Sequence, residues 1–366
     1  MTSVSSRFAV RDISALVVGG PSLNGTGGVD RVCRSIVEAL QRCGATCTYL
    51  GGADLVNQHG LKERWGYRVW GSLAEALLVA QEARNMAPHD IVVTNGPLGY
   101  GVKGRRSLHY YHGTYTGQAA AIGGAIRRRG SLKLKYLDGM LLEGLAGRGK
   151  TCLANSPATA REVQRYFGHT CHVVWCPVDT DAFSPGAADR ELLSGLGVTI
   201  DRPVGLFVGA GQAVKGEAAA IEVIRQFPTV AWLAIGDVES ALKSIPWVRL
   251  IRRVEAGQMP ALLRSVTFVL ITSLYESFCL LQAEALACGT PVIAGPTGAA
   301  ELFAAKGAVK GQQVADPRDV AGFVAALRSM LSDLPAARQA ALEGRRRVVD
   351  VLATDTWARR FVDLAL

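Results

Sequence analysis

Short apolar runs of strand length recur along the whole chain, and stretches with helical periodicity separate them. In the N-terminal half, the expected strands lie at 15–19, 46–51, 90–94, 108–111, 151–155 and 172–175. In the C-terminal half, they lie at 204–208, 230–235, 248–252, 268–271 and 292–294. Patterns such as those at 29–42 and 72–85 favour helices between the strands. Because strands that alternate with helices form parallel sheets, we predict an α/β fold with two βαβ-type halves.

A polar stretch at 179–189 separates the two halves. It contains Pro185 and Gly186 and no long apolar run, which is typical of a linker. We therefore predict an N-terminal domain at 1–180, a linker at 181–190 and a C-terminal domain at 191–366. A chain of 366 residues, 49% of them hydrophobic, is long enough to bury two cores.

Two glutamates, Glu276 and Glu284, stand eight residues apart in the segment YESFCLLQAEALACGTP at 275–291. An apolar run precedes the segment, and the residues from 279 to 287 favour a helix that ends where Gly289 can adopt a left-handed conformation. The two carboxylates would then lie up to about 12 Å apart along the axis, at about 1.5 Å per residue. Carboxylates accept hydrogen bonds from sugar hydroxyls, and N–H groups at a helix start face phosphate. The spacing therefore suggests a sugar-nucleotide site, while the alternative of a dipole-stabilising acid and a solvated glutamate stays open.

The same segment resembles the Glu-x7-Glu region of the large retaining glycosyltransferase family with the GT-B fold, which includes sucrose synthase and bacterial mannosyl- and glucosyltransferases. Six further segments resemble this family in the same order: 27–40, 109–115, 153–156, 176–183, 206–216 and 232–237. The resemblance implies two Rossmann-like domains that face each other across a cleft. It also implies that the final helix, at about 356–366, crosses back to the N-terminal domain. That segment is amphipathic, since Trp357, Phe361 and Leu364 share one helical face.

The resemblance implies roles for individual residues. Glu276 would bind the donor sugar, Lys215 would neutralise the donor phosphates, and His112 would contact the sugar or its phosphate. Glu284 would hold the ribose. The other expected donor-binding residues are Gly27, Gly28, Gly209, Gln212, Arg253, Val254, Ser277, Phe278, Cys279 and Leu280. Arg253 and Val254 would lie near the base, and both UDP- and GDP-linked donors fit the sequence.

Two positions depart from the family pattern. Ala210 stands where the family commonly has an arginine that acts as a second cation on the phosphates, so Gln212 or a basic residue of the other domain would have to replace it. Cys279 stands where the family usually has glycine, and its side chain would crowd the phosphate or reshape the sugar pocket.

Three other motifs point to different chemistry. GLAGRGKT at 144–151 fits the phosphate-loop pattern, but a helical pattern precedes it and a strand pattern follows, which is the reverse of that motif's context. GAGQAV at 209–214 is a near match to the dinucleotide fingerprint, with Val214 in place of the third small residue. Asp179 and Asp181 form a D-x-D pair of the kind that holds a metal on a diphosphate, but they fall in the expected linker, so we predict no metal and no cofactor.

The net charge of +9 is concentrated in one segment. Residues 101–150 carry ten lysines and arginines against two acids: Lys103, Arg105, Arg106, Arg127, Arg128, Arg129, Lys133, Lys135, Arg148 and Lys150 against Asp138 and Glu143. This favours an anionic or lipid-linked acceptor and peripheral contact with the inner membrane surface, although a solvated basic face is the alternative. Nucleic acid is not expected, because the nearby tyrosines form no obvious stacking platform.

Neither an apolar run long enough to span a bilayer nor a paired cysteine spacing is present, so we expect a cytoplasmic protein with free thiols. The predicted function is transfer of a hexose-type sugar from a nucleotide diphosphate sugar to an acceptor hydroxyl, with retention and without a metal. Its setting would be the synthesis of a cell-surface polysaccharide, a glycolipid or a secondary metabolite. The alternatives are a nucleotide-sugar epimerase and a non-catalytic sugar-nucleotide-binding protein of the same fold.

Overall fold

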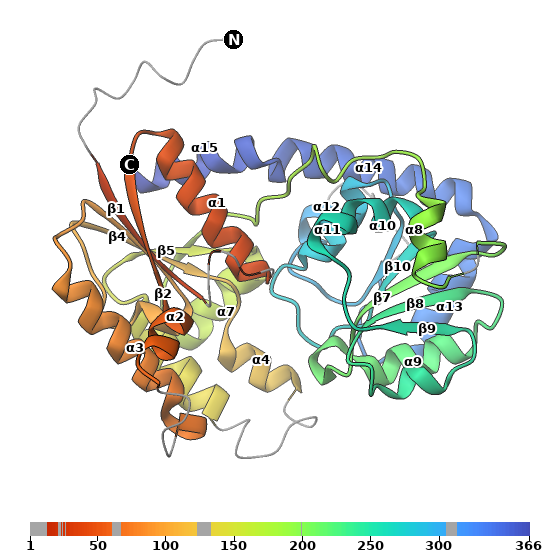
Figure 1. Ribbon diagram of the computed structural model, residues 1–366, viewed down its shortest axis with the longest axis horizontal. Coiled ribbons are helices and arrows are strands. Elements are labelled where there is room, and N and C mark those ends of the chain that lie inside the picture. The colour runs from red at the N-terminus through yellow and green to blue at the C-terminus, as the bar shows by residue number, and fades with distance from the viewer. Residues whose placement is uncertain are drawn as a thin grey trace, which may run out of the picture. The chain divides into compact units, whose positions relative to one another are not determined.

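The computed structural model describes residues 13–20, 23, 25, 27–60, 67–122, 133–198, 200–304 and 313–366. These residues form two compact units (Figure 1). The first contains the described residues up to Pro177 together with Thr354–Leu366, and the second contains those of Val178–Ala353. Each unit is built around its own parallel sheet.

The sheet of the first unit has six strands in the order β2-β1-β3-β4-β5-β6. The strands are β1 (Ser14–Gly19), β2 (Thr46–Gly51), β3 (Ile91–Asn95), β4 (Arg106–Tyr111), β5 (Thr151–Ala154) and β6 (Cys171–Val173). All neighbouring pairs are parallel. Strand β3 is buried along its whole length, which explains why it reads as a continuous apolar run rather than an alternating one.

The helices of the first unit lie between and after these strands. They are α1 (Gly28–Arg42), α2 (Gly52–Gln58), α3 (Tyr67–Asn85), η3 (Gly96–Gly99), α4 (Tyr115–Ile122), η4 (Lys133–Glu143), α6 (Gly144–Ala146), α7 (Pro157–Phe167) and α15 (Thr354–Ala365). Helix α7 shows how the sequence sets such bounds. Ser156 Oγ accepts a hydrogen bond from Thr159 N–H at 3.1 Å, Pro157 occupies the first turn, and Gly168 ends the helix in the left-handed region at φ 73°.

The last helix, α15, packs against α1 within the first unit. Trp357 and Phe361 stack with ring centroids 5.3 Å apart, and both side chains are fully buried. Arg42 of α1 forms an ion pair with Asp355 at 2.8 Å, and Arg106 donates hydrogen bonds to the carbonyls of Leu364 and Leu366. The helix is therefore part of the hydrophobic core and of the polar surface of this unit.

The sheet of the second unit has five parallel strands in the order β11-β10-β7-β8-β9. They are β7 (Val204–Ala210), β8 (Ala231–Gly236), β9 (Val248–Ile251), β10 (Phe268–Ile271) and β11 (Val292–Ala294). Their side chains form a large core in which Trp232 meets Phe268 edge to face at 5.3 Å. Such a perpendicular arrangement is favoured by the quadrupoles of the two rings.

Most of the described helices of the second unit are short. They are α8 (Arg190–Gly195), η5 (Ala213–Lys215), α9 (Glu217–Arg225), η6 (Ala241–Ser244), η7 (Ala256–Gln258), α10 (Met259–Ser265), α11 (Leu280–Ala287), α12 (Ala300–Ala304), α13 (Val320–Ser332) and α14 (Leu334–Leu352). No single helix in the described ranges is long and apolar enough to cross a bilayer, although α13 and α14 taken together reach that length with a bend of 104° between them.

The predicted strands are confirmed. Each of the expected runs forms a strand whose ends lie within two residues of the prediction, and every strand pair is parallel. The helix expected at 72–85 begins five residues earlier, at Tyr67. Helix α11 begins at Leu280, and Gly289 after it has φ 74°, as its predicted C-terminal position required.

Candidate functional site

The second unit brings Lys215 and Glu276 into direct contact. Lys215 is the last residue of η5, after β7, and Glu276 lies in the loop between β10 and α11. Lys215 Nζ donates a hydrogen bond to Glu276 Oε1 at 2.6 Å, and Ser273 Oγ donates to the same oxygen at 2.9 Å. Since β7 and β10 are parallel neighbours, the pair lies beyond the carboxyl edge of the sheet. Ligands bind at this edge in open α/β sheets.

The charge state of Lys215 follows from this contact. Burial alone would lower the pKa of Lys215, but the negative charge and the hydrogen bond of Glu276 outweigh that effect and raise it above its ordinary value. The lysine is therefore an ammonium ion at neutral pH. Its side chain is 33% exposed and that of Glu276 14%, so the pair is shielded but open to a ligand from one side.

Two glycines explain how the chain brings Lys215 to this place. Gly209 has φ 118°, and a Cβ atom there would lie 2.4 Å from Lys215 Cγ. Gly216 has φ 68°, and a Cβ atom there would lie 1.8 Å from the carbonyl oxygen of Thr272. Thr272 in turn donates a hydrogen bond from Oγ1 to the carbonyl of Lys215 at 3.0 Å. Only glycine fits both positions, and this close approach holds the lysine loop against the end of β10.

Cys279 adopts an uncommon backbone conformation at the start of α11. Among the described residues it is the one non-glycine residue with positive φ, at φ 83° and ψ 77°. Its side chain is 6% exposed, and burial raises the pKa of its thiol, so the sulfur is protonated. The preceding loop is fixed, because the carbonyls of Glu276 and Phe278 accept hydrogen bonds from Gly298 N–H at 3.0 Å and Ala299 N–H at 2.8 Å.

Glu284 lies inside α11 and is 5% exposed. The alternative in which it occupies a solvated helix face is therefore wrong. A carboxylate at a buried position needs polar partners, which agrees with a binding or structural role rather than a solubilising one.

Ala210, at the end of β7, is fully buried in the core of the second unit. Its side chain therefore points away from the exposed part of the site, next to a shift of strand register between Val208 and Ala210. Gln212 is exposed, and its N–H donates to the carbonyl of Gly209 at 3.0 Å. Neither Ala210 nor Gln212 therefore supplies a second cation. Among the described residues, Lys215 is the cation that contacts Glu276.

The remaining predicted donor residues of the second unit differ in burial. Phe278 is buried, whereas Ser277 and Leu280 are half-buried. Arg253 is exposed and pairs with Glu255 at 3.1 Å, and it follows β9 with Val254. Strand β9 lies two strands from β7, so Arg253 and Val254 are on the side of the site toward β8.

Sequence reasoning missed Thr272 and Ser273, which anchor the lysine loop and the Glu276 carboxylate. The available signal was the change from apolar to hydroxyl side chains at the end of the run VTFVLITS. Polar residues at the carboxyl end of a buried parallel strand face the ligand edge of the sheet.

The other predicted site residues belong to the first unit. His112 directly follows β4, and its Nε2 lies 2.8 Å from Asn95 Oδ1. Asn95 Nδ2 donates to the carbonyl of Val18 at 2.8 Å, which leaves Oδ1 as the acceptor and places the imidazole proton on Nε2. Burial lowers the pKa of His112 to about 4, so the ring is neutral at physiological pH.

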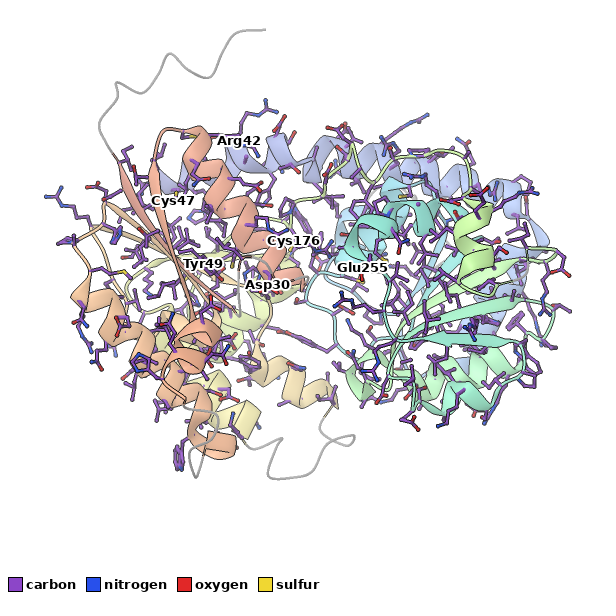
Figure 2. The ribbon with its side chains drawn as sticks, in the orientation of Figure 1. Asp30, Arg42, Cys47, Tyr49, Cys176 and Glu255 are labelled. Carbon is purple, nitrogen blue, oxygen red and sulfur yellow. The ribbon has the colours of Figure 1, made fainter. Side chains whose placement is uncertain are left out.

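Gly27 and Gly28 mark the start of α1, with Gly27 as the residue before the first turn. The Gly27 N–H donates to Asp30 Oδ2 at 3.2 Å, and Figure 2 shows Asp30 at this end of the helix. The Asp30 carboxylate is 5% exposed and already occupies that N–H group. It also adds a negative charge where a phosphate was expected to approach.

The competing motifs have structural explanations. Residues 144–150 follow η4, and residue 151 begins β5, so the segment lacks the strand-then-helix order of a phosphate loop. Lys150 Nζ instead donates to Thr94 Oγ1 at 3.0 Å and to the carbonyl of Gly99 at 2.7 Å. Asp179 Oδ1 accepts hydrogen bonds from Asp181 N–H at 3.1 Å and Ala182 N–H at 3.0 Å, so it stabilises a turn.

Two family models match the chain. Residues 26–182 match the model described as "Glycosyltransferase Family 4", and residues 202–333 match "Glycosyl transferases group 1". Together the two matches cover more than half of the chain, and each falls largely in one of the two units.

Curated proteins that are similar in sequence to this chain are named as a synthase of a sugar phosphate and as a glycosyltransferase. The chain is 24% identical over 217 residues to alpha-maltose-1-phosphate synthase of Mycobacterium tuberculosis. The aligned region covers 53% of this chain and 56% of that protein. It is 30% identical over 245 residues to D-inositol 3-phosphate glycosyltransferase of Segniliparus rotundus. Here the aligned region covers 60% of this chain and 53% of that protein. The matches thus span about half the length of these relatives.

Solved structures resemble the fold over nearly the whole chain. Sucrose-phosphate synthase from Thermosynechococcus elongatus superposes with a TM-score of 0.77 at 19% identity, over 97% of this chain and 98% of that one. Anabaena HepE in complex with UDP-glucose superposes with a TM-score of 0.66 at 17% identity, over 96% of this chain and 98% of that one. With its two parallel-sheet units and its two family matches, the chain belongs to the glycosyltransferases of the GT-B fold.

Proposed function

We propose that this protein transfers a hexose-type sugar from a nucleotide diphosphate sugar to an acceptor hydroxyl, with retention of the anomeric configuration and without a metal ion. The contact between Lys215 and Glu276 carries the proposal. It places a cation and a carboxylate side by side at the ligand edge of the second sheet. A diphosphate sugar needs both, because its phosphates are anionic and its sugar hydroxyls donate hydrogen bonds.

In this mechanism the bond between the anomeric carbon and the donor phosphate oxygen breaks, and negative charge develops on the leaving diphosphate. Lys215 stabilises that charge through its ammonium group, which Glu276 and the lysine loop hold in place before the donor binds. The acceptor oxygen forms its bond from the face that the diphosphate leaves, and its proton passes to the departing phosphate oxygen. Glu276 binds sugar hydroxyls and Glu284 the ribose.

The relatives support a nucleotide-linked donor. Two are named as a maltose-1-phosphate synthase and an inositol 3-phosphate glycosyltransferase, and HepE was solved with UDP-glucose. A UDP-linked hexose is accordingly the first donor to test, with the GDP-linked sugars as its competitors. The role of His112 stays a prediction, and its neutral ring with Nε2–H bound to Asn95 suits hydrogen bonding rather than charge pairing.

We propose an anionic or lipid-linked acceptor, reached in the cytoplasm at the inner membrane surface. The structure reduces the number of basic residues that can support this proposal. Lys133 is paired with Asp138 at 2.7 Å, Lys150 is bonded internally, and Arg106 holds the end of the chain. Arg127, Arg128 and Arg129 lie outside the described residues. The support therefore comes from the exposed cations Lys103, Lys135 and Arg148, and from Arg105, which is 84% exposed and lies 3.7 Å from Asp90.

The test is a panel of UDP- and GDP-sugars examined by thermal shift and by donor hydrolysis, with the parent protein and with Lys215→Ala and Glu276→Ala. Stabilisation and hydrolysis with one donor, lost in both variants, would support the transferase site. Stabilisation without turnover would favour a non-catalytic binding protein. Conversion of the donor to its epimer would favour the epimerase. Proton NMR of the product identifies the anomer, and a chelator identifies any need for a metal.

A further inference from the structure

The second unit contains a pocket of about 280 Å³ at the edge of its sheet opposite the Lys215 site. Its floor is formed where β8 and β9 begin, at Ala231 and Val248, and Arg202 precedes β7. Because the strands are parallel, these N-terminal ends lie at the edge away from Lys215 and Glu276. The pocket is therefore separate from the proposed donor site, and both can be occupied at once.

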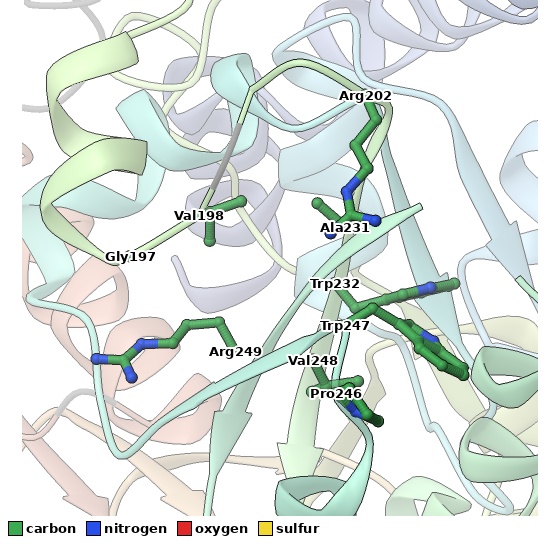
Figure 3. A pocket seen from close by; sticks show the side chains of 9 residues that line it. All are labelled: Gly197, Val198, Arg202, Ala231, Trp232, Pro246, Trp247, Val248 and Arg249. Carbon is green, nitrogen blue, oxygen red and sulfur yellow. The ribbon is translucent and has the colours of Figure 1, made fainter. Parts of the chain in front are cut away.

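The charged side chains that line this pocket are both arginines. Figure 3 shows Arg202 reaching down to Ala231, whereas Arg249 extends beside the loop that holds Gly197. Among the described residues that line the pocket, none is acidic. Two guanidinium groups on the wall of one pocket create a positive potential there, which favours an anionic ligand.

The hydrogen bonds of the two arginines are incomplete. Arg202 donates from Nη1 to the carbonyl of Pro228 at 3.0 Å, but its Nε is buried and has no hydrogen-bond partner among the described atoms. Arg249 donates from Nε to the carbonyl of Leu196 at 3.1 Å, which fixes the side chain close to its base and leaves the fork of the guanidinium at the surface. Arg202 Nε is enclosed by protein atoms, so a ligand oxygen would meet the terminal N–H groups of the two guanidiniums, which can donate hydrogen bonds to phosphate.

The size and the remaining walls narrow the ligand class. A volume of about 280 Å³ lies just below the usual range for small-molecule sites and suits a sugar monophosphate better than a nucleotide diphosphate sugar. Val198, Pro246 and Trp247 provide apolar surface for the carbon skeleton of such a ligand. Arginine forks match the oxygens of phosphate through paired hydrogen bonds.

We propose that this pocket is a second ligand site, which binds a small phosphate monoester through Arg202 and Arg249. It does not depend on the proposed transferase reaction, since it uses the opposite edge of the sheet. A ligand bound here contacts the starts of β8 and β9, two strands whose other ends lead into the donor side of the unit.

The experiment is isothermal titration calorimetry of the whole protein with glucose 6-phosphate as the probe, and with glucose and inorganic phosphate as comparisons. We expect binding of the ester, no binding of glucose and weaker binding of inorganic phosphate. Arg202→Met and Arg249→Met should each weaken binding of the ester at least tenfold. Arg249 is exposed, so its variant tests the site even if Arg202→Met fails to fold.

Two matched variants decide where the ester binds. Arg328→Met removes one exposed positive charge from α13, outside the pocket, and Lys215→Ala removes the cation of the donor site. Both should retain the affinity of the parent protein for the ester. Loss of binding in Lys215→Ala with retention in the two pocket variants would overturn the proposal in favour of the donor site. Equal losses in all arginine variants, equal affinity for inorganic phosphate, or no binding of the ester would overturn it as well.

Discussion

Lys215 Nζ lies 2.6 Å from Glu276 Oε1, although 61 residues separate the two in the chain. The contact exists because β7 and β10 are neighbours in the sheet and because Gly216 lets the lysine loop lie against Thr272. Neither residue is independent of the other. Glu276 raises the pKa of Lys215, and Lys215 compensates a carboxylate that is mostly buried. Two charged groups at this spacing are also the polar features that a diphosphate sugar requires.

The first prediction concerns this pair. Lys215→Ala should lower the rate of donor turnover by about 10- to 100-fold, because a charge-assisted hydrogen bond to phosphate contributes about 1.5–3 kcal/mol. Glu276→Ala should give a loss of similar size, and the double variant should lose less than the sum of the two. A double-mutant cycle on turnover with the identified donor measures the coupling. Strict additivity would mean that the contact has no role in turnover.

The second prediction concerns the left-handed backbone of Cys279. Cys279→Gly should stabilise the protein by about 1 kcal/mol relative to Cys279→Ala, because a left-handed conformation costs a residue with a Cβ atom about 1–2 kcal/mol. Both variants lose the thiol, so the comparison isolates the backbone. Urea unfolding measures the difference.

Cys288 provides the control for that comparison. It is buried and ends the same helix with φ −76°, in the right-handed region. There the glycine variant should be less stable than the alanine variant, since glycine gains no conformational relief and loses more entropy on folding. If glycine had the same effect at 279 and at 288, backbone strain would not explain the result.

The sequence could predict some features of the second unit and not others. The strands were readable because parallel strands buried on both faces are continuous apolar runs, and the end of α11 was readable because Gly289 and Pro291 allow few conformations. The contact of Lys215 with Glu276 was not readable, since it depends on which strands become neighbours. The left-handed conformation of Cys279 was also hidden, because its own residue type disfavours it.

The number of basic residues at 101–150 overestimated the positive charge available at the surface. The basic excess at 101–150 includes Lys150, whose ammonium group contacts Thr94 and Gly99 inside the first unit, and Arg106, which binds the last residues of the chain. Net charge along a sequence does not distinguish a cation on the surface from one that holds segments together. The positive potential at the surface of residues 101–150 is therefore weaker than their composition indicates.

Lys150 gives the third prediction, a dependence of stability on pH. Burial lowers its pKa to about 7 in the folded protein, against the ordinary value of 10.5 in the unfolded chain. Between these values the unfolded state binds more protons, so the contribution of Lys150 to the free energy of unfolding rises as pH rises from about 7 to 10.5. Lys150→Met should remove this slope. The measurement is the difference in urea midpoint between parent and variant at pH 7 and at pH 9.5, which should grow in favour of the parent at the higher pH. A constant difference would contradict the assignment.

His112 gives the fourth prediction. Burial lowers its pKa to about 4 from 6.5, so its imidazole should stay neutral down to about pH 4. Stability should decrease as pH falls from 6.5 to 4, because the unfolded state takes up the proton first. NMR titration of the ring protons checks this directly, and the shifts of His112 should not change near pH 6.5. Exposed His59 provides the reference signal of a solvent-accessible imidazole in the same spectra. A midpoint for His112 near 6.5 would remove the case for a neutral ring.

The last prediction tests whether α15 supports the core of the first unit. Trp357 is 1% exposed and stacks on Phe361, which is fully buried, so Trp357→Ala should cost about 3–5 kcal/mol of stability through lost burial and a residual cavity. Trp70 is 58% exposed on α3, and Trp70→Ala should change stability by less than about 0.5 kcal/mol. Comparison of the two variants by urea unfolding holds the chemistry constant and changes only the burial. A small effect at Trp357 would mean that burial of this side chain contributes little to the stability of the first unit.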